Sequence, residues 1–207
     1  MQRRHLLTYI GAASGALALA LFAGWWQVDG PGAPEPVAKR PLPLIEMDFR
    51  MTDQTGTAVG PESLLGTASM LYFGFTYCPD VCPTTLSDIS SWLDDLGEDV
   101  AELNVVFITI DPERDTVAAM AEYVSYFHPA IQGWSGSQEQ TVKAAEGFRA
   151  IFEKFATGGG DYTMNQSESV LLFDAAGQFA CTIDYHEPRE LAVQKIRRVL
   201  ARTEEET

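Results

Sequence analysis

Alternating and clustered apolar positions predict strands and helices in turn along the chain. Residues 45–51 place an apolar side chain at every second position, as a half-buried strand does, and a turn at Gly56 leads to a short return strand at 57–59. The apolar runs 69–76 and 104–110 are typical of buried central strands. We therefore expect a sheet that begins with an N-terminal β-hairpin.

Helical spacing of apolar residues and helix-start signals appear between the predicted strands. Four helices are expected, at 84–96, at 115–127, from the capping box at 137–140 to about 155, and after Pro188. A late hairpin is expected at 169–173 and 178–183, and Gly158 to Gly160 is interpreted as a flexible loop. Strands that alternate with helices predict an α/β fold with parallel strands and helices on its faces.

The N-terminal segment has the pattern of a membrane anchor. Arg3 and Arg4 precede residues 6–26, which carry no charge. An apolar run of this length spans a bilayer as one transmembrane helix, and the preceding arginines predict a cytoplasmic N-terminus and an exported remainder. A cleaved signal segment is the alternative. We expect an anchor (or signal segment) at 1–27, a proline-rich linker at 28–43 and a folded domain at 44–203.

The formal net charge of the chain is −15. Nucleic-acid binding depends on clustered lysine and arginine, so this charge argues against a nucleic-acid partner. It suits a basic protein partner, although it also serves solubility alone. Three cysteines are too few for a disulfide framework, and 207 residues are enough to bury a core without one.

Cys78 and Cys82 are the candidate chemical groups of the chain. They follow the predicted strand 69–76 and open the next helix, and residues four apart lie on one helix face. A helix N-terminus favours thiolate over thiol and lowers the pKa of a cysteine. Two such sulfurs can form a disulfide or hold a soft ion such as Cu(I). A zinc site is not indicated, because no second cluster of ligands is visible in the sequence.

The motifs around these cysteines resemble those of the Sco/SenC family. The chain reads FGFTYCPDVCP at 73–83 and DPERDT at 111–116, and the stretches 133–136 and 174–177 also fit. The similarity extends over residues 42–200. It implies a thioredoxin-like fold and a copper-binding role in the assembly of cytochrome c oxidase.

The resemblance implies that Cys78, Cys82 and a histidine bind copper, as Cu(I) or Cu(II). Gln166 stands at the position of that histidine, and Asn165 at the position of the acidic residue before it. An amide oxygen is a hard donor that suits Cu(I) poorly. Met164 has a soft thioether and would share a strand face with Gln166. It is either a substitute ligand or a packing residue.

The implied partner is the copper-bearing subunit of cytochrome c oxidase, or another extracytoplasmic copper or thiol protein. The implied location is the periplasmic face of the inner membrane, through the N-terminal helix. Three functions stay open: a copper-binding assembly factor, a metal-independent thiol–disulfide oxidoreductase using Cys78 and Cys82, and a tethered binding module without chemistry. The full motif argues against the third.

The resemblance also places the loop 111–115 near the cysteines. One expectation is that Arg114 and a neighbouring aspartate form a buried pair that orients this loop. The alternative is that Asp115 or Thr116 caps the N-terminus of the following helix.

Overall fold

The computed structural model describes residues 19, 21–22, 25 and 40–205. The chain divides into two units, residues 1–39 and residues 40–207, and the second is described below. The predicted anchor 1–27 and linker 28–43 lie almost entirely outside the described residues. Among the described helices, none combines the length and the apolar character that a membrane crossing needs.

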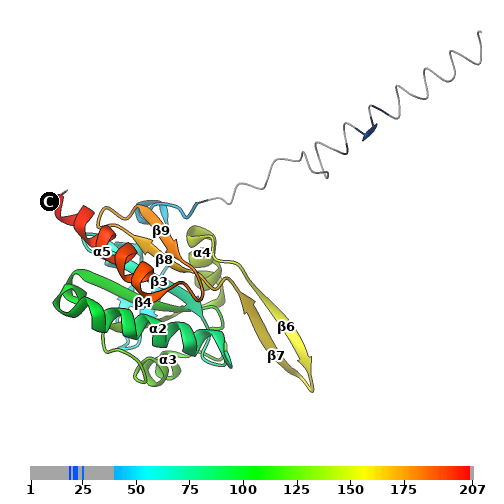
Figure 1. Ribbon diagram of the computed structural model, residues 1–207. Helices are drawn as coiled ribbons and strands as arrows, with labels where there is room; N and C mark the ends of the chain where they lie inside the picture. Colours follow the sequence, from blue (N-terminus) through cyan, green and yellow to red (C-terminus); the bar gives the residue numbers. More distant parts are fainter. Residues whose placement is uncertain (1–18, 20, 23–24, 26–39, 206–207) are drawn as a thin grey trace, which may run out of the picture. The chain divides into compact units, whose positions relative to one another are not determined.

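A seven-stranded sheet lies at the centre of the second unit, with strand order β2–β1–β5–β4–β3–β8–β9 (Figure 1). Strands β3, β4 and β5 pair in parallel, and the outer strands pair antiparallel. The strands of this sheet are β1 (Met51–Asp53), β2 (Ala58–Val59), β3 (Ala68–Gly74), β4 (Leu103–Thr109), β5 (Ile131–Ser135), β8 (Val170–Phe173) and β9 (Phe179–Ile183).

The parallel register of β3 and β4 brings two loops together. Gly74 at the end of β3 pairs with Thr109 at the end of β4. The loops that follow these strands, 75–80 and 110–116, therefore start from the same edge of the sheet. This is the edge at which open α/β sheets bind their ligands.

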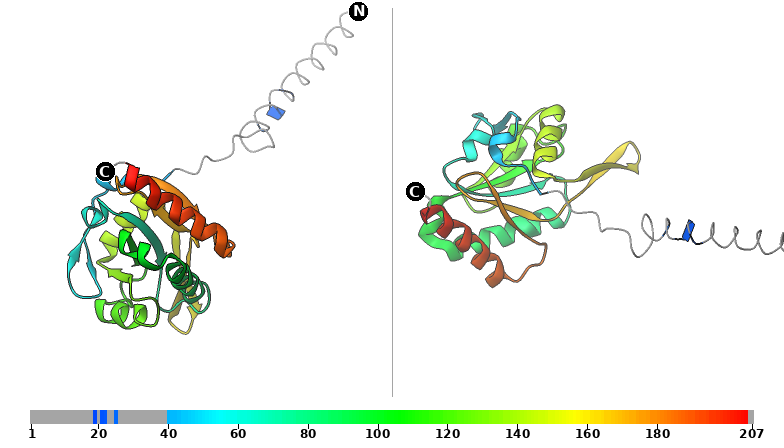
Figure 2. Two further views of the ribbon diagram at one scale, coloured as in Figure 1. Left: turned by 60° about the vertical axis from the view of Figure 1, so that its left-hand side comes forward. Right: turned by 90° about the horizontal axis from the view of Figure 1, so that it is seen from above.

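Helices cover both faces of the sheet. Helices α2 (Val81–Leu96) and α5 (Arg189–Glu205) lie side by side on one face, and α4 (Gln138–Phe148) lies on the other (Figure 2). Successive residues of β3 point to opposite faces of the sheet. Tyr72 stacks on Phe107 of β4 and donates to Cys82 of α2, whereas the ring of Phe73 contacts Phe148 of α4. Tyr123 of the short helix α3 (Val117–Val124) contacts Phe107 on the α2 side.

A two-stranded hairpin leaves the body of the sheet, formed by β6 (Phe152–Gly158) and β7 (Asp161–Gln166) (Figure 1). The prediction of a helix to about residue 155 is wrong at its end, because Arg149 adopts a left-handed backbone with φ of 57° and terminates α4. Gly158 to Gly160 form the tip of the hairpin, with φ of 94°, 65° and 89°. These left-handed conformations favour glycine.

The predicted strand 45–51 is also wrong. Leu44–Glu46 is a 3₁₀ helix (η1), and β1 begins only at Met51. Met47, Phe49 and Met51 are buried as the alternation requires, whereas Ile45, in η1, is 76% exposed. The backbone before β1 pairs elsewhere, because the N–H of Arg50 donates to the side chain of Gln140 at 2.7 Å. Alternation reports which side chains are buried and does not report whether the backbone joins a sheet.

Most other predictions of elements are confirmed within a few residues. The expected strands 69–76 and 104–110 correspond to β3 and β4, the late hairpin to β8 and β9, and the expected helices to α2, α3 and α5. The hairpin at the start of the domain exists as the short pair β1 and β2. Strand β5 was not predicted, because its sequence IQGWS carries a glycine and little alternation.

Candidate functional site

Cys78 and Cys82 lie at the start of α2 in different environments. Cys82 is fully buried, with no exposed surface, whereas Cys78 is partly exposed. Both are free thiols. The backbone N–H of Cys82 donates to the sulfur of Cys78 at 3.3 Å. The sulfur of Cys78 therefore accepts one of the N–H groups that a helix N-terminus leaves without an intrahelical partner.

These environments move the pKa values of the two thiols in opposite directions. The pKa of Cys78 falls to about 6, chiefly because the thiol of Cys82 donates to its sulfur and also because backbone N–H groups at the helix start point at it. The pKa of Cys82 rises, because the neighbouring Cys78 takes the negative charge and because Cys82 is buried. The pair thus favours a thiolate on the accessible sulfur and a thiol on the buried one.

Two polar side chains surround the sulfur of Cys82. The amide Nε2 of Gln166 donates to this sulfur at 3.1 Å and to the hydroxyl oxygen of Tyr72 at 3.2 Å. The Tyr72 hydroxyl lies 3.7 Å from the same sulfur and donates to it. Gln166, at the end of β7, is therefore in direct contact with the cysteine pair.

Gly74 makes room for this arrangement. A Cβ atom at this position would lie 2.5 Å from the Phe107 ring and 2.9 Å from the sulfur of Cys82. Any side chain there would displace one of the two. The glycine at the end of β3 is thus required by close approach and not by a left-handed backbone.

Asp115 ties the two loops at this sheet edge together. Its carboxylate accepts hydrogen bonds from the backbone N–H and the hydroxyl of Thr76 and from the hydroxyl of Thr109. Burial raises the pKa of Asp115, and the bonds from Thr109 and Thr76 oppose that rise. Because Thr76 lies two residues before Cys78, the carboxylate holds the start of the cysteine loop.

Arg114 joins the loop 110–116 to the hairpin. Its side chain pairs with Asp111 and donates to the backbone oxygen of Tyr162 at 3.2 Å. The guanidinium lies 3.8 Å from the centre of the Tyr162 ring and 4.7 Å from that of Tyr77. The Tyr162 hydroxyl donates to Asp111 at 2.8 Å. The expected Arg–Asp pair is therefore present, and Thr116 is the N-cap of α3, with its hydroxyl accepting from Ala119.

Lys154 completes this contact from the other strand of the hairpin. Its ammonium lies 3.7 Å from the centre of the Tyr162 ring and pairs with Glu113 at 2.8 Å. Burial of the Tyr162 hydroxyl, and then its hydrogen bond to Asp111, raise the pKa of Tyr162 to about 12. The hairpin is thus held, through Lys154 and Tyr162, on the loop that also supports the cysteines.

Met164 lies between Tyr162 and Gln166 on β7. It is partly buried and packs against the core. Its partner on β6 is Lys154, while Tyr162 pairs with Ala156 and Gln166 with Phe152. Residues two apart in a strand share a face, so Tyr162, Met164 and Gln166 point to the same side, as the sequence predicted for Met164 and Gln166.

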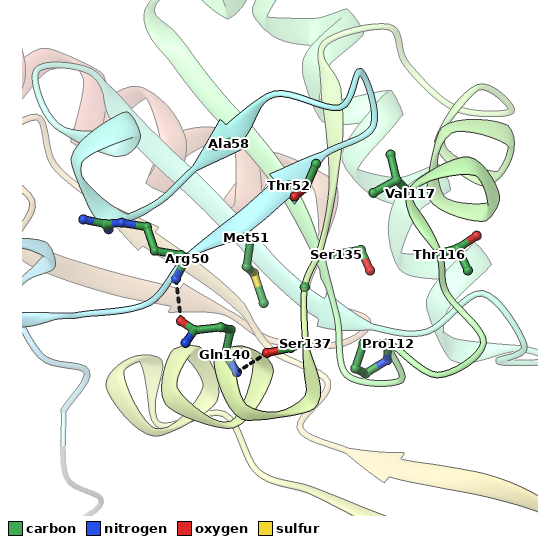
Figure 3. Close-up of a pocket in the computed structure, with 11 residues that line it drawn as sticks. Arg50, Met51, Thr52, Ala58, Pro112, Thr116, Val117, Ser135, Ser137 and Gln140 are labelled. Atoms are coloured by element: carbon green, nitrogen blue, oxygen red, sulfur yellow. Dashed lines mark hydrogen bonds between the residues drawn. The ribbon is translucent and has the colours of Figure 1, made fainter.

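Figure 3 shows a separate groove of about 600 Å³ between β1 and the starts of α3 and α4, whose lining includes neither cysteine. Its lining residues include Arg50, Thr52, Pro112, Thr116 and Gln140. The lining is made of hydroxyl, amide and apolar groups with the single charge of Arg50, which is paired with Glu62 at 3.0 Å.

The sequence did not indicate Tyr72 or Tyr162 as members of this site. A weak signal existed for each. Tyr72 is the only residue of β3 whose ring carries a hydroxyl group, and buried tyrosines usually find a hydrogen-bond partner. Tyr162 stands four residues before Gln166, where strand periodicity places it on the same face. Within the described residues, no group of three or more His, Cys, Asp and Glu side chains is arranged to hold a metal ion.

The comparisons with known proteins all find similarity to Sco proteins. The model of the SCO1/SenC family matches residues 37–201. An SCO2-like protein of Rickettsia conorii is 36% identical over 134 residues, which are 64% of this chain and 65% of that protein. The mitochondrial SCO2 homolog of Danio rerio is 39% identical over 154 residues, 71% of this chain and 53% of that protein. The chain thus spans between half and two thirds of the length of these relatives.

A solved structure supports the same likeness. The copper-bound ScoI of Bradyrhizobium japonicum is 40% identical, with a TM-score of 0.69, and the match covers 73% of this chain and 96% of that one. The fold of residues 40–205 is therefore a thioredoxin-like Sco fold.

Proposed function

Because the chain belongs to the SCO1/SenC family, we propose that it is a copper-binding assembly factor for the copper site of cytochrome c oxidase. Copper is its cargo, taken up through Cys78 and Cys82. The partner that receives it is the copper-bearing subunit of the oxidase or another extracytoplasmic copper or thiol protein.

One observation carries this proposal: the two sulfurs meet at a helix N-terminus, and one of them is accessible. Thiolates are the soft donors that Cu(I) prefers. The pKa of Cys78, at about 6, leaves it deprotonated at neutral pH. Gln166 and Tyr72 hold Cys82 in position. Uptake of copper then needs the loss of one proton, from Cys82.

The location is part of the proposal. The uncharged run 6–26 after Arg3 and Arg4 supports an inner-membrane anchor that leaves the folded domain in the periplasm. Free thiols in an oxidising compartment require either a metal or a reductant to stay functional.

The test is copper stoichiometry on the reduced full chain in detergent, loaded anaerobically with Cu(I) against a competing chelator. We expect one copper per chain, lost in both Cys78→Ser and Cys82→Ser. The matched control is Cys181→Ser, which removes the third thiol and should keep the copper. Copper retained by both Cys78→Ser and Cys82→Ser would refute the assignment of the site.

A specific observation favours a second function, metal-independent thiol–disulfide exchange. Gln166 presents an N–H donor to Cys82, where the resemblance implies a nitrogen ligand. In this function the Cys78 thiolate attacks a disulfide of a partner protein and releases one partner thiolate. Cys82 then loses its proton and attacks the sulfur of Cys78, which releases the second partner thiol and leaves a Cys78–Cys82 disulfide. Two electrons pass to the partner.

The two functions differ in what the metal does. If exchange is the function, the chain reduces a model disulfide with and without copper at the same rate, and chelation changes nothing. If copper delivery is the function, Cu(I) loading blocks this reaction because it occupies both sulfurs. The rate of reduction of a disulfide-linked peptide, measured with and without Cu(I), decides between them.

A further inference from the structure

We propose that Met164 supplies the third copper ligand of this chain, so that Cu(I) binds to the sulfurs of Cys78, Cys82 and Met164. The inference rests on the proposed copper function and deepens it. It replaces the nitrogen ligand that Gln166 cannot supply with a thioether two residues earlier on the same strand.

Strand geometry places Met164 on the same face of β7 as Tyr162 and Gln166. At one end of this face, Tyr162 lies on Arg114, whose guanidinium also contacts the ring of Tyr77. At the other end, Gln166 contacts the sulfur of Cys82. Met164 lies midway between these two contacts.

The loop between those contacts contains Cys78. Tyr77 immediately precedes Cys78, and Cys82 follows it by four residues. Strand β7 thus contacts Cys82 directly, through Gln166, and reaches Tyr77 through Arg114, and Met164 lies between these two positions on the strand. The ladder is regular here, since Lys154 pairs with Met164 and Phe152 with Gln166, and the one irregularity lies nearer the hairpin tip.

The chemistry of the three donors agrees with the cargo. Cu(I) prefers thiolate and thioether sulfur to amide or carboxylate oxygen. A methionine side chain has three rotatable bonds, so its sulfur can approach an ion without movement of the strand. The nearby cation of Lys154 is paired with Glu113 at 2.8 Å and lies over the Tyr162 ring.

Gln166 then has a different role from that of a ligand. Its Nε2 donates to Cys82 and orients this sulfur, as hydrogen bonds around metal ligands commonly do. The Oε1 atom of the same amide is one of four buried side-chain polar atoms that have no hydrogen-bond partner in the described residues. Buried polar atoms are rarely left unpaired without a reason such as an absent ligand or water.

The direct test uses the selenomethionine form of the full chain, reduced and loaded with one equivalent of Cu(I). X-ray absorption at the selenium edge detects copper bonded to selenium. We expect a copper neighbour for one of the six methionines, and its loss in Met164→Leu. This readout does not depend on activity. The selenium–copper contact is measured first in the unsubstituted chain, so a folding defect in Met164→Leu does not affect that measurement.

Affinity provides the second readout. Met164→Leu should weaken Cu(I) binding about tenfold or more, a change of about 1.4 kcal/mol. Leucine keeps the volume of methionine. The matched control is Met120→Leu, which removes a fully buried thioether in α3 and should leave the affinity unchanged.

The outcomes separate this inference from the proposed function. Copper lost in Cys78→Ser, with no selenium–copper contact and an unchanged affinity in Met164→Leu, would overturn the ligand assignment and leave the copper function standing. A wild-type chain that binds no Cu(I) would overturn both.

Discussion

At the scale of single residues, the site depends on an unequal pair of sulfurs. Cys78 is accessible and accepts an N–H from the start of α2, whereas Cys82 is buried beneath Tyr72 and Gln166. A thiolate is the nucleophile and the metal ligand, so Cys78 is the first sulfur to react with an incoming ion or disulfide. Cys82 follows once its proton leaves.

The pH dependence of thiol reactivity tests this inequality. The pKa of Cys78 is lowered from 9.0 to about 6, so its thiolate persists as the pH falls and is lost only below about pH 6. We expect alkylation of Cys78 by iodoacetamide to rise with a midpoint near pH 6, with Cys82 reacting more slowly at neutral pH. Mass spectrometry of the two peptides measures both rates.

A variant isolates the cause of that shift. The Cys82 thiol makes the largest contribution to the lowered pKa of Cys78. Cys82→Ala removes it and should move the midpoint of Cys78 alkylation upward. A wild-type midpoint near 9, or faster alkylation of Cys82 than of Cys78, would contradict the assigned environments.

At the scale of elements, the parallel strands β3 and β4 create the site by ending side by side. Asp115 bridges the loops that follow them, with bonds to Thr76 and Thr109. Arg114 extends the connection to β7 through Tyr162. Three segments that are far apart in the sequence are thus held in one place, and each contributes a group next to the cysteines.

Removal of the Asp115 carboxylate should destabilise the fold. Asp115→Ala leaves one buried N–H and two hydroxyls without their acceptor. A buried donor left unpaired costs roughly 1–3 kcal/mol, and the hydroxyls can rotate to other partners, so we expect the free energy of unfolding to fall by about 3 kcal/mol. Urea denaturation followed by circular dichroism measures it.

The control for this prediction is Asp99→Ala, at an exposed position in η3 (Gly97–Glu102). Surface substitutions of this kind change stability by no more than about 0.5 kcal/mol. Equal losses in the two variants would show that the bridge between the loops contributes nothing beyond a surface carboxylate.

At the scale of the whole molecule, the proposed location rests on the N-terminal run, and the net charge of −15 bears on the kind of partner. A strongly acidic domain attracts a basic partner surface and speeds its encounter, an effect that weakens as salt is added. A membrane anchor would confine both partners to the same surface.

Export of the domain is testable with a reporter that folds only outside the cytoplasm. Alkaline phosphatase fused after residue 43 should be active in a Gram-negative host, because Arg3 and Arg4 keep the N-terminus inside. The same reporter fused to a chain lacking residues 1–27 should be inactive. Activity in both fusions, or in neither, would contradict the assignment of 1–27 as the exporting segment.

The sequence by itself determined the local features of this protein. The apolar runs identified β3 and β4, the helical spacing identified α2 and α5, and the position of Cys78 and Cys82 at a strand-to-helix junction indicated the candidate site. These features depend on neighbours within a few residues, which periodicity and helix-start signals report. The alternation in 45–51 led to the wrong prediction of a strand, because a local pattern of apolar residues does not report which segment the backbone pairs with.

Only the tertiary structure decided what surrounds the cysteines. Gln166 meets Cys82 across 84 residues of sequence, and it meets Tyr72 across 94. No local pattern encodes these contacts, because they follow from the order of the strands in the sheet and from the return of the β6–β7 hairpin to the loop 110–116. The hairpin itself escaped prediction, since β6 is almost wholly exposed and lacks the apolar face that marks a strand in sequence. Its tertiary packing against Arg114 is what brings Gln166 to Cys82.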